Sequence, residues 1–123
     1  MRFRLLIAIA LGAMPAAVQA MPVAAFLTKA DALQRKGPMA LFSSDLKLLT
    51  NQIKRDAGEL RAENKAAEAA GRRKSYCAPT GGVKLTNRDI LGAMHAVPPP
   101  KRATTQTKDA LRAYFARRFP CPR

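Results

Sequence analysis

The sequence has little of the chemistry that enzymes and metal sites need. It contains one histidine, His95, and two cysteines, Cys77 and Cys121, among 123 residues. Three such ligands at these positions match no zinc-binding spacing, so no metal site is expected. No serine stands in a nucleophile-elbow context, and the glycine-rich stretch 80–83 lacks the length and the lysine of a phosphate-binding loop. The sequence therefore predicts a protein that is not an enzyme and that holds no cofactor.

Acidic residues are also scarce. Eight Asp and Glu stand against 22 Lys and Arg, which gives a net charge of +14. A chain this basic attracts an acidic protein, anionic lipid, wall polymer or nucleic acid, or simply carries a general surface charge. Half of the acids fall in the stretch 56–68, where helical spacing makes them solvated partners of neighbouring bases. These acids are Asp56, Glu59, Glu63 and Glu68, and their expected partners are Lys54, Arg55, Arg61 and Lys65.

No apolar run is long enough to span a membrane, because the longest, residues 5–14, has half of the roughly 20 residues required. Arg2 and Arg4 precede this run, and residues 18–20, Val-Gln-Ala, follow it as a small-x-small site. A basic start, a short apolar centre and small residues at the end are typical of a secretory signal peptide. Residues 1–20 are therefore predicted to be removed, and residues 23–25 offer an alternative cleavage site.

Export changes how the rest of the chain is interpreted. Residues 1–20 hold two of the basic residues and no acid, so residues 21–123 carry 20 basic and eight acidic side chains, a net charge of +12. These 103 residues suit a single small domain in the periplasm or outside the cell, with no membrane span. An oxidising compartment favours a bond between Cys77 and Cys121, and it argues against nucleic acid as the partner.

The periodicity of apolar residues predicts an all-α fold, with no strand-like alternation anywhere. Helix stops come from Gly37-Pro38, from the prolines at 98–100 and from Pro120. Apolar residues thin out after Leu60, so the end of the long second helix is expected to project into solvent or to fray. Its apolar stripe is short for a coiled coil, so a homodimer through this helix is an alternative that the sequence does not favour. The expected helices cover residues 22–36, 44–70, 86–97 and about 105–118.

Two signals place the last pair of helices together. Thr86 and Asp89 form a capping-box pattern, with Leu85 and Ile90 placed for a hydrophobic staple. The proline turn that follows is short, so the two helices should form an antiparallel hairpin. Cysteines 77 and 121 flank this hairpin and should therefore meet at one end. By the chain-entropy relation, closing such a loop stabilises the fold by up to about 4 kcal/mol.

Residues 76–121 resemble the C-terminal half of the Rap/Tai family of immunity proteins, which belong to type VI secretion systems. The shared pattern ends on Phe119-Pro120-Cys121. Its earlier parts are Tyr76-Cys77-x-Pro79, the spaced apolar residues Leu85, Ile90 and Leu91, a proline-containing turn, and Ala110-Leu111. The resemblance covers about 46 of the 103 residues expected after cleavage, and the N-terminal half departs from the family pattern.

The resemblance implies a small exported helical protein, often dimeric, that binds and blocks an effector toxin injected into the periplasm. It assigns no inhibitory residue to this sequence. A second hypothesis follows from charge alone: a basic envelope-associated protein held electrostatically on wall polymer, lipid or an acidic protein. Salt dependence separates the two hypotheses, since a shape-complementary interface survives moderate salt better than diffuse attraction.

The signal-peptide prediction is checked by N-terminal sequencing of the exported protein. The sequence should begin at Met21, or at Phe26 if the alternative site is used, because small residues stand before each of these positions. A membrane-embedded product that keeps Met1 would contradict the prediction.

Overall fold

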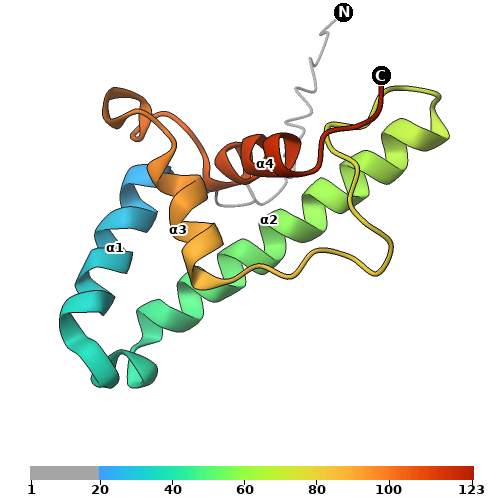
Figure 1. Ribbon diagram of the computed structural model, residues 1–123. Coiled ribbons are helices and arrows are strands. Elements are labelled where there is room, and N and C mark those ends of the chain that lie inside the picture. The colour runs from blue at the N-terminus through green and yellow to red at the C-terminus, as the bar shows by residue number, and fades with distance from the viewer. Residues whose placement is uncertain (1–19) are drawn as a thin grey trace, which may run out of the picture.

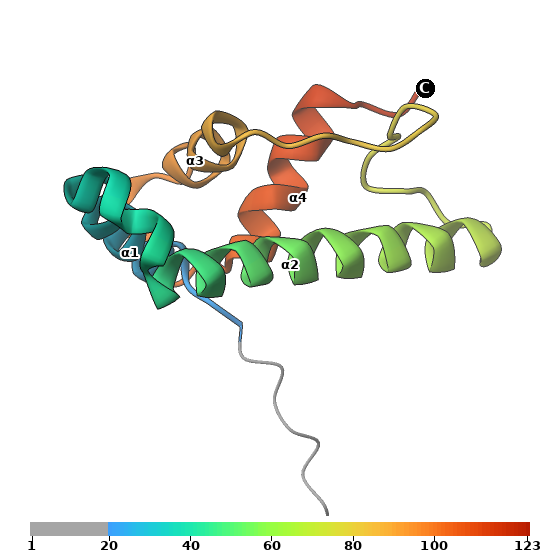
Figure 2. The same ribbon diagram turned by 90° about the horizontal axis from the view of Figure 1, so that it is seen from below.

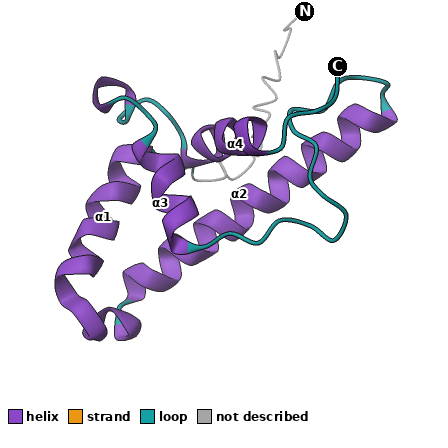
Figure 3. Cartoon of the chain, viewed as in Figure 1, coloured by secondary structure: helices purple, strands orange, loops and turns teal. Residues whose placement is uncertain are grey.

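The computed structural model describes residues 20–123, so the predicted signal peptide, residues 1–20, lies outside the described residues except for Ala20 (Figure 1). Within the described part the chain is all-α, as predicted, and Figure 3 shows helices and loops without a strand. The four α-helices are α1 (Val23–Lys36), α2 (Ser44–Ala69), α3 (Asn87–His95) and α4 (Thr107–Arg118). Two short 3-10 helices, η1 (Gly37–Phe42) and η2 (Pro99–Lys101), stand between them.

The 26-residue α2 is the axis of the bundle. Figure 2 shows α3 and α4 on one side of it, with α1 at its N-terminal end. One apolar cluster joins α1, the first half of α2 and the buried Met94 of α3. A second cluster lies further along α2 and consists of Leu60, Tyr76, Leu111 and Phe115. The partly buried Leu85 packs against both clusters and so connects them.

Local signals set the helix boundaries. Gly37 adopts a φ of 56°, a left-handed conformation that glycine accepts readily, and it ends α1. Ser43 begins α2, because its hydroxyl accepts a hydrogen bond from the backbone N–H of Asp45. Only η1, which is six residues long, separates the last residue of α1 from Ser43, so α1 and α2 meet at a sharp corner (Figure 1).

The predicted capping box of α3 is confirmed. The hydroxyl of Thr86 accepts from the N–H of Asp89 at 3.2 Å, and the carboxylate of Asp89 accepts from the N–H of Thr86 at 2.9 Å. The same carboxylate accepts hydrogen bonds from two α4 side chains, Tyr114 at 3.0 Å and Arg118 at 3.1 Å. Hydrogen bonds from Thr86, then from Tyr114, lower the pKa of Asp89 to about 2. A local cap therefore also links α3 to α4.

The end of α2 does not fray, because the chain stays helical to Ala69, and most of its side chains after Leu60 are exposed, as expected. The side chain of Asn64 donates to the carbonyl of Tyr76 at 3.0 Å and accepts from the N–H of Ser75 at 3.0 Å. Ala67, one turn further on, is 9% exposed. The loop after α2 folds back along the helix because Tyr76 inserts into the second apolar cluster. This return is a long-range contact, which helix propensity cannot report.

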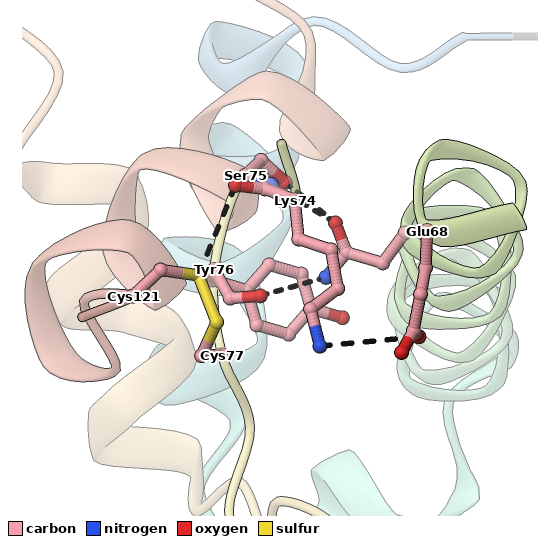
Figure 4. Close-up of a disulfide and its surroundings, with 7 residues drawn as sticks. Glu68, Lys74, Ser75, Tyr76, Cys77 and Cys121 are labelled. Atoms are coloured by element: carbon pink, nitrogen blue, oxygen red, sulfur yellow. Dashed lines mark hydrogen bonds and ion pairs between the residues drawn. A yellow bond between two sulfur atoms is a disulfide. The ribbon is translucent and has the colours of Figure 1, made fainter. Parts of the chain in front are cut away.

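The structure joins Cys77 and Cys121, as predicted. Figure 4 shows the bond beside Tyr76, near the last turns of α2 that carry Glu68. The N–H of Cys77 also donates to the carbonyl of Phe119 at 2.8 Å. Cys77 precedes α3 by ten residues, so the bond fastens the returning loop to the segment after α4.

The segment closed by the disulfide contains α3 and α4, which pack against each other. Figures 1 and 2 both show these two helices crossing steeply. The connection between them, residues 96–106, is eleven residues long and includes η2. Arg102 holds it by donating to the carbonyls of Val97 at 2.8 Å and His95 at 3.1 Å. A connection of this length leaves the crossing angle to packing, whereas a tight turn would impose an antiparallel pair.

Removal of the disulfide should destabilise one part of the bundle more than the other. In the Cys77→Ser, Cys121→Ser variant, the free energy of unfolding should fall by up to about 4 kcal/mol, because the loop of 44 residues is no longer closed. Hydrogen exchange should show the greatest loss of protection at Leu60 and Leu111 in the second cluster, and little loss in α1. An equal loss in both clusters would mean that the bundle opens as one unit.

Candidate protein-binding surface

An exposed apolar corner marks the junction of α1 and α2. Met39, Leu41 and Phe42 of η1 are 65%, 75% and 84% exposed, and Leu48 in the second turn of α2 is 45% exposed. These are the exposed large hydrophobic side chains of the described residues, and they come from one ten-residue stretch. Contiguous exposed apolar side chains are typical of interaction sites. We call these four residues the apolar corner.

The corner arises from the geometry of η1. Gly37 and Pro38 end α1, and the tight 3-10 turns that follow give the four successive apolar residues 39–42 no common helix face to bury. Only Ala40 packs against the core, while the residues on either side of it face outwards. In the sequence, residues 39–42 are only a short apolar stretch after a Gly-Pro stop. The Gly-Pro stop indicates that the helix ends here. The outward orientation of the apolar side chains that follow is decided by the fold.

A separate apolar groove lies between α1, α2 and α3, and Leu46 and Leu49, the sequence neighbours of Leu48, are among its lining residues. Its volume is about 240 Å³, and Leu33 of α1 also lines it. Further lining residues are Phe26, Ala30, Ile53, Ile90 and Leu91. The polar side chains of Gln34, Thr50 and Asn87 stand at its edges. A concave apolar surface with a few polar groups is the usual form of a binding site.

The border of the groove is basic. Lys47 and Lys54 are exposed and flank Thr50 at helical spacings of three and four, so they form one row along the groove. Arg88 is exposed next to Asn87 on α3. None of these three cations forms an ion pair within residues 20–123. The acids nearest in the chain are Asp45, which pairs with Lys29 at 3.3 Å, Asp89, which pairs with Arg118 at 3.1 Å, and the exposed Asp31.

Most acids of α2 form ion pairs with residues outside this helix. They do not pair with the helical neighbours that the sequence suggested. Glu63 receives Lys108 at 2.8 Å and Arg112 at 3.0 Å, both from α4. Hydrogen bonds from these two cations lower the pKa of Glu63. Glu59 also pairs with Lys108, at 3.3 Å. The ion pairs of the described chain involve five different basic residues. The other fifteen of the 20 basic residues in 21–123 have no acidic partner there.

Among residues 20–123, Asp56 is the one buried acidic side chain, at 3% exposure, so its expected role as a solvated partner is wrong. Its two oxygens accept from the hydroxyl of Thr107 at 2.7 Å and the amide of Gln52 at 2.9 Å. Burial raises its pKa, and the two hydrogen bonds oppose that rise. The arrangement joins the start of α4 to the middle of α2. Both partners are neutral and within the core, which makes this a structural contact.

The residues that sequence reasoning singled out lie away from the corner. His95 is exposed at the end of α3. The disulfide lies beside the C-terminal half of α2, next to Tyr76, whose carbonyl accepts from Asn64, whereas the corner is at the beginning of this helix. Nowhere in the described part of the chain do three His, Cys, Asp or Glu side chains gather as metal ligands. From Ala20 onwards, no helix combines the length and the apolarity that crossing a membrane takes.

The chain matches no family model, no curated protein and no solved structure. The similarity of residues 76–121 to the Rap/Tai family therefore stays a prediction. The apolar corner and the groove are identified from their exposure, shape and charge alone.

The buried carboxylate gives a pH-dependent stability that can be measured. Because the folded-state pKa of Asp56 is raised above 3.8, folding binds a proton, and stability should fall as pH rises from below 3.8 through the raised value. The Asp56→Asn variant lacks this titration, so its Tm relative to the original chain should be higher at pH 7 than at pH 3.5.

Asp56→Ala is the comparison variant: it also lacks the titration, and it leaves Thr107 and Gln52 without their acceptor, so it should be about 1–3 kcal/mol less stable than Asp56→Asn at either pH. If the Tm difference between Asp56→Asn and the original chain does not change with pH, the carboxylate is not desolvated.

Proposed function

We propose that this chain is an exported periplasmic binding protein of the immunity type, which neutralises an injected effector by binding it. The observation that carries the proposal is the apolar corner, where Met39, Leu41 and Phe42 stand 65–84% exposed. A small protein gains stability by burying such side chains, and here three of them in one short turn remain outside. The corner is therefore available to a partner.

The composition of the corner suits a protein partner. A phenylalanine that is 84% exposed can enter a pocket on the partner, and large aromatic anchors of this kind dominate interface energetics. Methionine beside it adapts its shape to an irregular surface. Burying an anchor of this size contributes about 2 kcal/mol or more to binding. The separate groove extends the contact to a segment that lies between α1, α2 and α3.

Charge complementarity points to an acidic partner. Lys47, Lys54 and Arg88 border the groove without acidic partners of their own in residues 20–123. An acidic rim on the effector would speed its association and fix its orientation. A second copy of this chain would bring the same cations together across a symmetric contact, which opposes a homodimer at this face.

The disulfide agrees with an oxidising location such as the periplasm or the cell exterior. It lies beside the C-terminal half of α2, away from the corner at the beginning of that helix, so it stabilises the scaffold without occupying the binding surface (Figure 4). Resemblance to immunity proteins over residues 76–121 falls within this stapled part of the chain. On this proposal the C-terminal half is scaffold and the N-terminal half carries the contact.

A second candidate function is electrostatic attachment to the cell envelope. It is favoured by the fifteen basic residues of 21–123 that have no acidic partner in the described structure. Diffuse attraction of this kind needs no apolar contact and weakens steeply with salt. The two candidates therefore differ in which side chains they require.

The binding proposal is tested by using residues 21–123 as bait for periplasmic effectors. Leu41→Ser, Phe42→Ser should reduce capture of an acidic partner at least tenfold, because it removes the exposed anchors without touching the core. The matched control is Arg72→Ser, Arg73→Ser, which removes two exposed charges beyond the far end of α2 and should leave capture within twofold. A captured effector should be toxic when produced alone in the periplasm and harmless when produced with this chain.

The reverse pattern would sink the binding proposal. If the arginine variant loses capture, the serine variant keeps it, and 0.5 M salt releases the bound material, then the chain is an envelope-associated basic protein. Association of the chain with itself, abolished by Leu41→Ser, Phe42→Ser, would identify the corner as a homodimer contact.

A further inference from the structure

A second, polar cavity lies where the chain reaches α1. Its volume is about 360 Å³, and both Ala20 and Met21 line it. The other walls come from α2, from Gln106 and from the first half of α4. They include Gln52, Asp56, Glu59, Gln106 and Asp109. The predicted cleavage point, between residues 20 and 21, therefore falls on the edge of a cavity in the folded protein.

The backbone holds Met21 firmly at this place. Its carbonyl accepts a hydrogen bond from the N–H of Thr107 at 2.9 Å, and the N–H of Val23 donates to the carbonyl of Thr105 at 2.8 Å. Pro22 and Gln106 form an antiparallel bridge between these two bonds. The first residues of the predicted exported chain are thus paired with the residues that lead into α4.

Two polar groups in this cavity lack partners. The side-chain oxygen of Gln106 is buried and accepts no hydrogen bond from the part of the chain that the structure describes. The backbone nitrogen of Met21 donates none to any residue from 20 to 123. Buried polar groups are nearly always paired, so the buried and unpaired side-chain oxygen of Gln106 calls for an explanation.

The charge of the cavity supplies an explanation for the unpaired oxygen of Gln106. Its walls carry three acids, Asp56, Glu59 and Asp109, against two bases, Lys108 and Arg112. This excess of acid is unusual in a protein with a net charge of +12 after cleavage. The dipole of α4 disfavours a cation at its N-terminus, but Asp109 in the first turn and Asp56 behind it offset that effect. One further positive charge would balance the cavity.

We infer that the cavity is the binding site for the α-ammonium group that cleavage creates on Met21. Hydrolysis by a peptidase of the export machinery adds one water across the Ala20–Met21 bond, leaving a carboxylate on Ala20 and an ammonium on Met21. The ammonium donates to the side-chain oxygen of Gln106, and the wall carboxylates neutralise it. The amide nitrogen of the uncleaved chain carries no charge, so it cannot balance the charge of the wall carboxylates. The inference rests on the predicted cleavage site and is independent of the proposed partner.

Removal of the leader then completes the fold. The new terminus ties the start of α1 to the start of α4, next to the contact between Asp56 and Thr107. A chain that keeps its leader lacks this tie and is less stable. Charge-assisted hydrogen bonds of this kind are about twice as strong as neutral ones, so the difference is measurable.

The test compares residues 21–123 bearing a free Met21 amine with the same chain carrying one added alanine before Met21. Both are released from a fusion protein with defined ends. The added alanine keeps the charge but moves it out of the cavity by one residue, about 3.8 Å, and should lower Tm by about 5 °C at pH 6. The same alanine after Arg123 is the control and should leave Tm unchanged. Above pH 10, where the ammonium loses its proton, the difference should shrink.

Gln106→Met identifies the acceptor. It should lower the Tm of the chain that begins at Met21 and have little effect on the alanine-extended chain, since the two changes remove the same interaction. Equal effects of Gln106→Met in both chains, or a Tm that is insensitive to the added alanine, would overturn the inference. N-terminal sequencing of the exported protein that finds a first residue other than Met21 would also overturn it.

Discussion

The crossing of α4 over the middle of α2 is the contact on which the other elements depend. Leu60 and Leu111 are fully buried in it. Polar contacts then fix the register of the two helices, with Thr107 bonded to Asp56 and Lys108 and Arg112 bonded to Glu63. These contacts combine a dry apolar centre with pairs that have one correct alignment. The returning loop, the N-terminal segment and α3 all attach to α4 once it is placed.

The two ends of α2 differ: the chain is held tightly at one end and exposes large apolar side chains at the other. At the end of this helix, Asn64, Tyr76 and the Cys77–Cys121 bond hold the chain tightly. At its beginning, η1 presents large apolar side chains to solvent. Exposed apolar residues reduce what a small domain gains from burial, and the disulfide offsets that loss by restricting the unfolded chain. A stapled scaffold can therefore carry an adhesive corner.

The distribution of charge follows from the same packing. Most of the acids are engaged within the bundle: the cations of α4 pair with Glu59 and Glu63, and Asp89 caps α3. The basic residues are far more numerous, so most of them remain on the surface without partners. Folding pairs most of the acids with cations, so the charges that remain unpaired on the surface are mainly positive. This leaves a basic border around the groove and one acidic cavity beside Met21.

The sequence by itself determined the parts that depend on neighbouring residues. Helix ends at Gly37 and Ser43, the Thr86–Asp89 cap and the all-α class come from local backbone and side-chain chemistry, which is set within a few residues. The pairing of the two cysteines followed from their number and from the oxidising compartment that the predicted signal peptide implies. Tertiary structure alone decided the fate of Asp56, the return of Tyr76 along α2 and the outward orientation of Phe42. Each of these depends on residues far away in the chain that bury, bond or leave uncovered a given side chain, and such long-range contacts have no signature in local spacing.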